Sequence, residues 1–193
     1  MSQTMSQTTT ISPTPDLAAV KAKQQRTWSA GDYAIVGATL QIISEELCEA
    51  ADLHPDQRVL DVATGNGGTA IAAARRFCDV TGIDYVPELL TRARERAVAE
   101  GFAITFTEGD AEDLPYEDAT FDAVTSTLGV MFTADQPKGA AELLRVCRPG
   151  GVIALANWAP DGFVGRLFQT VGTHRPPPAR GPGPAARAHS RRR

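Results

Sequence analysis

The chain is poor in the residues that build metal sites and disulfide frameworks. Its 193 residues include three cysteines and three histidines, and neither set has the spacing of metal ligands. Cys48, Cys78 and Cys147 are far apart in apolar or helical contexts, which is typical of small buried side chains in a reducing compartment. The sequence therefore predicts no metal site and no disulfide framework.

Long apolar runs are also missing. No run approaches the ~20 residues that a helix needs to cross a bilayer. The polar N-terminus lacks the basic start and the apolar segment of a secretion signal. We therefore expect a soluble, cytoplasmic protein without a membrane span.

Acidic residues are absent from the C-terminal end. Residues 162–193 contain seven arginines and no acid, whereas residues 1–161 contain 12 basic and 23 acidic side chains, a net charge of −11. The acidic part argues against a nucleic acid bound through its phosphates. The arginines could in principle contact an anionic surface, but a polyarginine end without an apolar face is poorly suited to specific recognition.

Both ends of the chain have compositions that do not support a packed core. Residues 1–15 are polar and contain proline, and residues 174–193 use only six residue types, none of them large and apolar. We expect both segments to be disordered. The folded part between them should be a single domain, since a chain of 193 residues with 42% hydrophobic side chains can bury one core.

Strand and helix patterns alternate after a helical stretch at 16–53. The expected strands lie at 58–62, 79–83, 104–108, 121–127 and 151–157, and the expected helices between them lie at 68–77, 87–100 and 134–147. Alternation of this kind implies right-handed crossovers and a parallel sheet covered on both faces. The sequence therefore predicts a doubly wound, mainly parallel α/β fold of the Rossmann-like type.

A glycine-rich segment follows the first expected strand. Asp61 lies near the end of this strand, and Ala63, Gly65, Gly67 and Gly68 follow it just before a helix. Glycine permits a tight turn and the close approach of a ligand, and the free N–H groups of a helix N-terminus favour negative charge. The segment therefore predicts a site for a nucleoside-containing cofactor.

The glycine spacing fits two cofactors. Ala63, Gly65 and Gly68 can form a dinucleotide fingerprint with alanine in the first position, while Asp61, Gly65 and Gly67 can form an S-adenosylmethionine loop. The carboxylate favours the second cofactor, because the ammonium and sulfonium groups of S-adenosylmethionine are cationic. Alternatively, Asp61 accepts hydrogen bonds from amides of the loop.

Two further acids follow the next two strands. Asp84 is placed to bind a ribose diol through two hydrogen bonds to one carboxylate, although it could also cap the helix that begins near Pro87. Asp110 and the backbone N–H of Ala111 present an acceptor and a donor that match the amine and a ring nitrogen of adenine. These positions extend the predicted cofactor site over three strands.

Five ordered motifs resemble those of the class I S-adenosylmethionine-dependent methyltransferases, in the branch that acts on small molecules and quinone-type lipids. The motifs lie at 58–67, 80–84, 108–115, 121–122 and 145–151. The resemblance implies contacts to the methionine end of the cofactor from the loop that contains Asp61, Ala63, Gly65 and Gly67. It also implies ribose contacts from Asp84, with Tyr85 beside it, and adenine contacts from Asp110 and Ala111.

The resemblance assigns two more segments to the site. Leu128–Met131 lines the methyl-donor pocket in similar proteins, and Trp28–Tyr33 resembles an N-terminal lid within a helical region at 16–57. Within this lid, Asp32 and Tyr33 are the candidates for a base that deprotonates the acceptor, although no motif marks any residue as that base. Ala63 replaces the first glycine of the commonest loop pattern, which is a mild departure.

The resemblance ends before the chain does. It implies a seven-stranded sheet whose last two strands follow 151–157, whereas the likeness stops at about Ala179. We therefore expect a methyltransferase domain at 16–173 that is C-terminally truncated or frame-shifted and lacks its last strands, followed by a disordered tail.

The implied activity is transfer of a methyl group from S-adenosylmethionine to a small-molecule acceptor by in-line displacement. One alternative is an inactive, cofactor-binding remnant of such an enzyme. A second alternative is an NAD(P)-dependent oxidoreductase, which would need a proton-relay pair such as Tyr-x-x-x-Lys after the fourth or fifth strand, and the sequence has none. The acceptor and the oligomeric state are left open.

Overall fold

A computed structural model describes residues 16–31 and 33–174. The lid candidate Asp32 lies outside the described residues, as do residues 1–15 and 175–193, which fall in the segments expected to be disordered. The chain divides into two compact units, one ending at Asn157 and the other beginning at Trp158, and each unit is described by itself.

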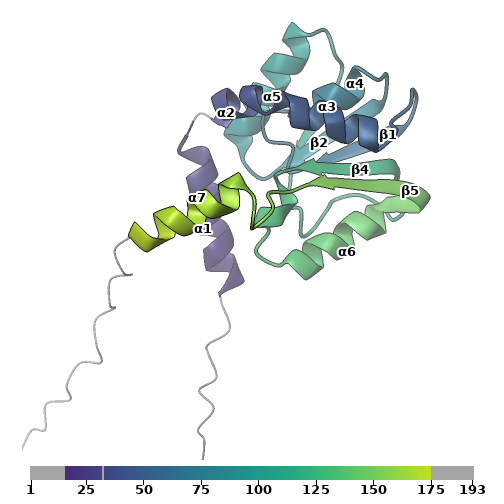
Figure 1. The fold of residues 1–193 in the computed structure, drawn as a ribbon. Helices are drawn as coiled ribbons and strands as arrows, with labels where there is room; N and C mark the ends of the chain where they lie inside the picture. The colour runs from purple at the N-terminus through teal and green to yellow at the C-terminus, as the bar shows by residue number, and fades with distance from the viewer. Residues whose placement is uncertain (1–15, 32, 175–193) are drawn as a thin grey trace, which may run out of the picture. The chain divides into compact units, whose positions relative to one another are not determined.

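Five parallel strands form one sheet in the first unit, in the order β3-β2-β1-β4-β5 (Figure 1). The strands are β1 (Arg58–Val62), β2 (Asp79–Asp84), β3 (Thr105–Glu108), β4 (Phe121–Thr127) and β5 (Cys147–Ala156). All neighbouring strands pair in parallel. The predicted parallel α/β fold is therefore confirmed, with β1 at the centre of the sheet and all carboxyl ends at one edge.

Helices cover both faces of this sheet (Figure 1). α3 (Gln41–Ala50), α4 (Gly68–Ala74) and α5 (Pro87–Ala99) lie on one face, and α6 (Gln136–Val146) lies on the other. Val59 of β1 packs in the buried cluster that includes residues of α3, α4 and α5. Leu60 and Val62 pack in the cluster that includes residues of α6. Full burial of a side chain such as Leu60 contributes roughly 1.5–3 kcal/mol, so packing on both faces fixes the central strand and the loop that follows it.

The last strand of the sheet begins earlier than the sequence indicates. The sequence predicts a strand at 151–157, but the chain becomes extended at Cys147, directly after α6, and this residue pairs with Phe121. The register then shifts between Phe121 and Ala123, and Gly150 adopts a φ of 75°. The additional residues join the strand through an irregularity at a glycine, which hydrophobic periodicity does not reveal.

Two helices precede α3 in the first unit, α1 (Leu17–Ser29) and α2 (Tyr33–Thr39). Asp16 caps α1, because its Oδ1 accepts the backbone N–H of Ala19 at 3.1 Å. No side chain of α1 is fully buried. The partly buried ones have the spacing of a single helix face: Lys21, Gln24, Gln25 and Trp28. This face holds α1 to the rest of the first unit.

The second unit contains α7 (Phe163–His174). Within the described part of the chain, no strand follows β5. A Cβ atom at Gly165 would lie 2.0 Å from the carbonyl oxygen of Pro160, so only glycine permits the tight approach of the first turn of α7 to the preceding loop. Among the described residues, no helix combines the length and the hydrophobicity that crossing a bilayer requires.

Candidate functional site

The predicted cofactor residues follow neighbouring strands at one edge of the sheet. β1 lies between β2 and β4, and β3 flanks β2, so the segments after their carboxyl ends are neighbours. In open parallel α/β sheets, ligands bind in the crevice outside these ends. The strand order therefore brings together the glycine-rich loop after β1, Asp84 at the end of β2 and the acidic turn at Asp110 after β3.

The glycine-rich loop at 63–67 contains three residues with left-handed backbone conformations. Their φ angles are 54° at Ala63, 56° at Gly65 and 81° at Gly67. A Cβ atom added at Gly65 would meet no protein atom within 4 Å, whereas one added at Gly67 would lie 3.1 Å from the Cβ of Ala93. Gly67 is therefore fixed by packing against α5, while Gly65 borders open space that a ligand can enter.

Asp61 is buried beneath this loop, with an exposed fraction of 1%. Its Oδ2 accepts the hydroxyl of Thr64 at 2.6 Å and the backbone N–H of Ala70 at 3.2 Å, and its Oδ1 accepts the hydroxyl of Thr125 at 3.1 Å. Burial raises the pKa of Asp61 to about 7, although these three donors act in the opposite direction. The carboxyl group ties the loop to α4 and β4, which is the alternative role that the sequence leaves open. Its contact with the methionine end of a cofactor stays a prediction.

Asp84 supports the loop from the end of β2. Its Oδ2 accepts the backbone N–H of Gly65 at 2.9 Å, and its Oδ1 accepts that of Val86 at 2.9 Å. Burial raises the pKa of Asp84, and the backbone donors oppose this shift. Val86 is the N-cap residue of α5, so Asp84 orients the entry to the helix without capping it. Each carboxylate oxygen has two acceptor sites, so both can accept a further hydrogen bond from a ribose; that role stays a prediction.

The acidic turn at Asp110 is paired with a cation from α1. The Nζ of Lys21 lies 2.5 Å from Oδ2 of Asp110 and 2.7 Å from Oε2 of Glu112. Asp110 Oδ1 also accepts the backbone N–H of Glu112, and Glu112 Oε1 accepts that of Asp135. Ala111, the predicted adenine donor, is buried within this turn. The turn is thus held by several hydrogen bonds, and Lys21 lies at the acceptor that is predicted to bind adenine.

The other inward-facing side chains of α1 reach the segments after β2 and β4. Gln25 donates from Nε2 to the carbonyl of Tyr85 at 2.7 Å, and Gln24 donates to the carbonyl of Phe132 at 2.7 Å. The ring of Trp28 packs against that of Phe132, with centroids 5.2 Å apart. α1 therefore contacts the segments after β2, β3 and β4. Its function as a lid stays a prediction.

The turn after β4 packs directly against the glycine-rich loop. Leu128 has a φ of 57° and donates its backbone N–H to the carbonyl of Ala156 at 2.8 Å. A Cβ atom at Gly129 would lie only 2.5 Å from the Cβ of Ala63. Met131 lies in the short 3-10 helix η1 (Val130–Phe132) that continues the turn. The predicted methyl-donor segment is therefore in contact with the predicted methionine loop.

Tyr85 directly follows Asp84 and is half-buried. Burial raises the pKa of its phenol to about 12, and the charge of Asp84 acts in the same direction. The phenol is therefore neutral at physiological pH, and its ring offers an apolar surface beside the predicted ribose acceptor.

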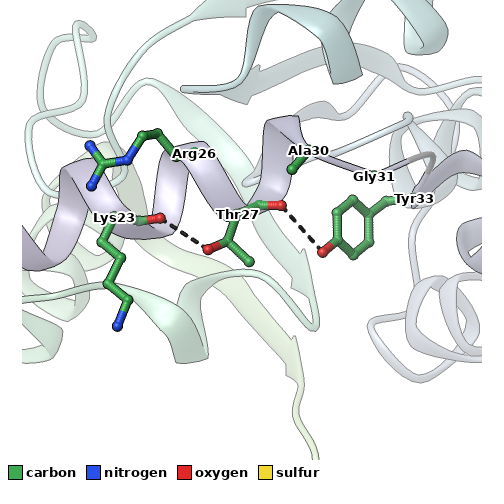
Figure 2. Close-up of a pocket in the computed structure, with 6 residues that line it drawn as sticks. All are labelled: Lys23, Arg26, Thr27, Ala30, Gly31 and Tyr33. Atoms are coloured by element: carbon green, nitrogen blue, oxygen red, sulfur yellow. Dashed lines mark hydrogen bonds between the residues drawn. The ribbon is translucent and has the colours of Figure 1, made fainter. Parts of the chain in front are cut away.

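A shallow hollow lies beside the C-terminal end of α1 (Figure 2). The hydroxyl of Tyr33 donates to the carbonyl of Thr27 at 3.3 Å, and the ring of Tyr33 lies 5.0 Å from that of Trp28. The hollow is lined by Lys23, Arg26, Thr27, Ala30, Gly31 and Tyr33. None of the predicted cofactor-binding residues lines it. Because of its hydrogen bond to Thr27 and its ring contact with Trp28, Tyr33 braces the end of α1.

Several residues that hold the site together are absent from the sequence-based prediction. Lys21, Gln24 and Gln25 share a helix face with Trp28, and this spacing is the signal that could have identified them. Arg96 of α5 has no such signal. It donates to the backbone carbonyl of Asn66 in the loop at 3.0 Å, and burial lowers its pKa.

A family model described as a methyltransferase domain matches residues 60–155. The matched segment runs from β1 into β5. It contains the glycine-rich loop, Asp84, Asp110 and the turn at Leu128, so the edge of the sheet described above lies within it.

Relatives and a solved structure extend this likeness. An uncharacterized protein of Mycobacterium tuberculosis is 42% identical over 169 residues, which cover 87% of this chain and 62% of the relative. The demethylmenaquinone methyltransferase of Deinococcus radiodurans is 44% identical over 125 residues, which cover 63% of this chain and 52% of the relative. A solved structure assigned as a methyltransferase, from Bacillus halodurans, matches with a TM-score of 0.59 at 30% identity and covers 66% of this chain and 56% of that chain. This chain spans less than two thirds of the length of each.

Proposed function

We propose that this chain, as a member of the class I S-adenosylmethionine-dependent methyltransferase family, binds S-adenosylmethionine and transfers the methyl group to a small-molecule acceptor. The contact between Asp84 and the glycine-rich loop carries this proposal. Asp84 Oδ2 accepts the backbone N–H of Gly65 at 2.9 Å, so a ribose acceptor lies against a glycine that borders open space.

The described residues suit this cofactor at three points. Asp84 offers carboxylate oxygens to the ribose hydroxyls, Asp110 and the N–H of Ala111 match the edge of adenine, and the loop at 63–67 leaves space beside Gly65 for the methionine end. When bound, S-adenosylmethionine supplies an electrophilic methyl group on a sulfonium that is a good leaving group. Adenine and ribose also occur in a dinucleotide, so the match of residues 60–155 to a methyltransferase domain is what favours S-adenosylmethionine.

The chain itself would supply position and exclusion of water. α1 contacts the segments after β2, β3 and β4, and would shield the methyl group from solvent. Asp61 is a poor base toward an acceptor, because it is buried and already accepts three hydrogen bonds. The hydroxyl of Tyr33 is directed to the carbonyl of Thr27. A base is needed only where the acceptor must lose a proton.

The name of the Deinococcus radiodurans relative supports a quinone-type acceptor. The experiment is transfer of a labelled methyl group from S-adenosylmethionine to a reduced demethylated naphthoquinone. We expect labelled product from the parent chain and from Asp79→Ala, an exposed acid at the other end of β2, and at least a tenfold loss in Asp84→Ala. Cofactor binding without transfer to any quinol would exclude a quinone-type acceptor and leave either another small-molecule acceptor or the inactive remnant.

A further inference from the structure

Within the second unit taken by itself, one face of α7 is apolar and exposed. Phe163, Leu167, Phe168 and Val171 have exposed fractions of 74%, 46%, 60% and 49%. Their spacing places them within one arc of the helix, and the opposite arc carries glycine, glutamine, threonine and Arg166. An exposed apolar stripe with a polar rim marks an interaction surface.

The sequence that contains this helix is also strongly basic. Residues 162–193 have seven arginines and no acid, whereas the other 161 residues have a net charge of −11. The same end of the chain therefore combines an apolar helix face with an excess of positive charge.

An anionic lipid surface matches both features. Amphipathic helices with aromatic and aliphatic side chains on one face lie in the plane of the membrane interface, and nearby arginines are attracted to anionic headgroups. A nucleic acid would match the arginines but offers no comparable surface for two phenylalanines. A second copy would match the apolar face but would bring an identical positive charge against it.

We propose that α7 docks this protein on an anionic membrane surface, with its apolar face in the boundary between headgroups and acyl chains. The helix lies in the interface and does not cross it, since 12 residues extend only about 18 Å. The acidic remainder of the chain is repelled by such a surface, which confines the contact to this end. The proposal is independent of methyl transfer, because docking needs neither cofactor nor acceptor.

Co-sedimentation of the full chain with lipid vesicles tests the proposal. We expect binding to vesicles of equal phosphatidylcholine and phosphatidylglycerol, and binding at least tenfold weaker to phosphatidylcholine alone. Raising the salt from 0.1 M to 1 M should release the protein, because the screening length falls from about 10 Å to about 3 Å.

Paired variants identify the surface. Leu167→Gln combined with Phe168→Gln removes apolar contact and keeps residues compatible with a helix, and should weaken vesicle binding at least tenfold. Gln169→Ala, on the polar face, is the matched control and should bind like the parent. Far-UV circular dichroism checks that both variants retain helix.

Three results would overturn the proposal. The first is equal sedimentation of the double variant and the parent, and the second is no sedimentation of the parent with anionic vesicles. The third is a dimer in light scattering that the double variant dissociates, in the absence of vesicle binding, because the face would then be an interface between copies of this chain.

Discussion

At the scale of single residues, the acids at the ends of β1 and β2 perform different tasks. Asp61 is 1% exposed and receives two hydroxyl donors and one backbone donor, whereas Asp84 is 5% exposed and receives backbone donors that include Gly65 of the loop and Val86. The sequence places both acids at strand ends and suggests ligand roles for both. It does not show that Asp61 points beneath the loop, because that depends on Thr125, which lies 64 residues further along the chain.

The protonation of Asp61 gives a prediction about pH. Its pKa of about 7 in the folded protein lies above the unfolded value near 3.9, so the folded protein binds the extra proton. The contribution to the free energy of unfolding is therefore fully present below about pH 4 and is lost as the pH rises through 7. It amounts at most to about 4 kcal/mol. Denaturant unfolding of the parent and Asp61→Asn from pH 4 to 8 should show the parent losing stability relative to the variant.

A constant difference in stability across that range would contradict this account of Asp61. It would mean that the donors from Thr64, Thr125 and Ala70 outweigh burial and keep the carboxylate ionised.

Gly65 gives a second prediction at this scale. Gly65→Ala places a Cβ in open space but forces alanine into a left-handed conformation, so the stability cost should be about 1–2 kcal/mol. Affinity for S-adenosylhomocysteine should fall at least tenfold, because the Cβ occupies the proposed ligand space. Gly101→Ala is the matched control, since Gly101 has a φ of 78° and an equally open Cβ position. Its stability should fall similarly while its affinity stays unchanged; equal affinities in both variants would remove the loop from the site.

At the scale of elements, the sheet is easier to predict than the contacts of α1. β1 and β4 occupy the expected ranges 58–62 and 121–127, because short segments rich in β-branched and aromatic residues and bounded by turn signals form strands. The periodicity of α1 shows which side chains share a face. It does not show what lies opposite, and Lys21 is 89 residues from Asp110.

The contacts of Lys21 predict how firmly α1 is held. Lys21→Met removes the cation from Asp110 and from Glu112, which is 4% exposed. Hydrogen exchange of the amides at 17–29 should accelerate roughly tenfold, equivalent to about 1.4 kcal/mol, while exchange in β1 stays unchanged. Lys23→Met, on the exposed face of the same helix, should have no such effect. Identical exchange in the two variants would show that α1 is held by Trp28 and the glutamines instead.

At the scale of the whole molecule, charge and site are divided along the chain. The residues proposed to bind the cofactor all lie before Asn157, in the acidic part, and the exposed apolar helix lies in the basic part that follows. The matched family segment, 60–155, is confined to the first unit. Cofactor binding and surface docking are therefore assigned to different parts of the sequence and can be tested separately.

Isothermal titration calorimetry with S-adenosylhomocysteine and NADH tests the central claim most directly. The account predicts that the parent chain binds S-adenosylhomocysteine and not NADH. Asp84→Ala should lose roughly 1.5–3 kcal/mol of binding free energy, the scale of hydrogen bonds to a charged group, and Asp79→Ala at the other end of β2 should lose none. Binding of NADH instead, or unchanged affinity for S-adenosylhomocysteine in a folded Asp84→Ala variant, would contradict the assignment of this edge of the sheet as the S-adenosylmethionine site.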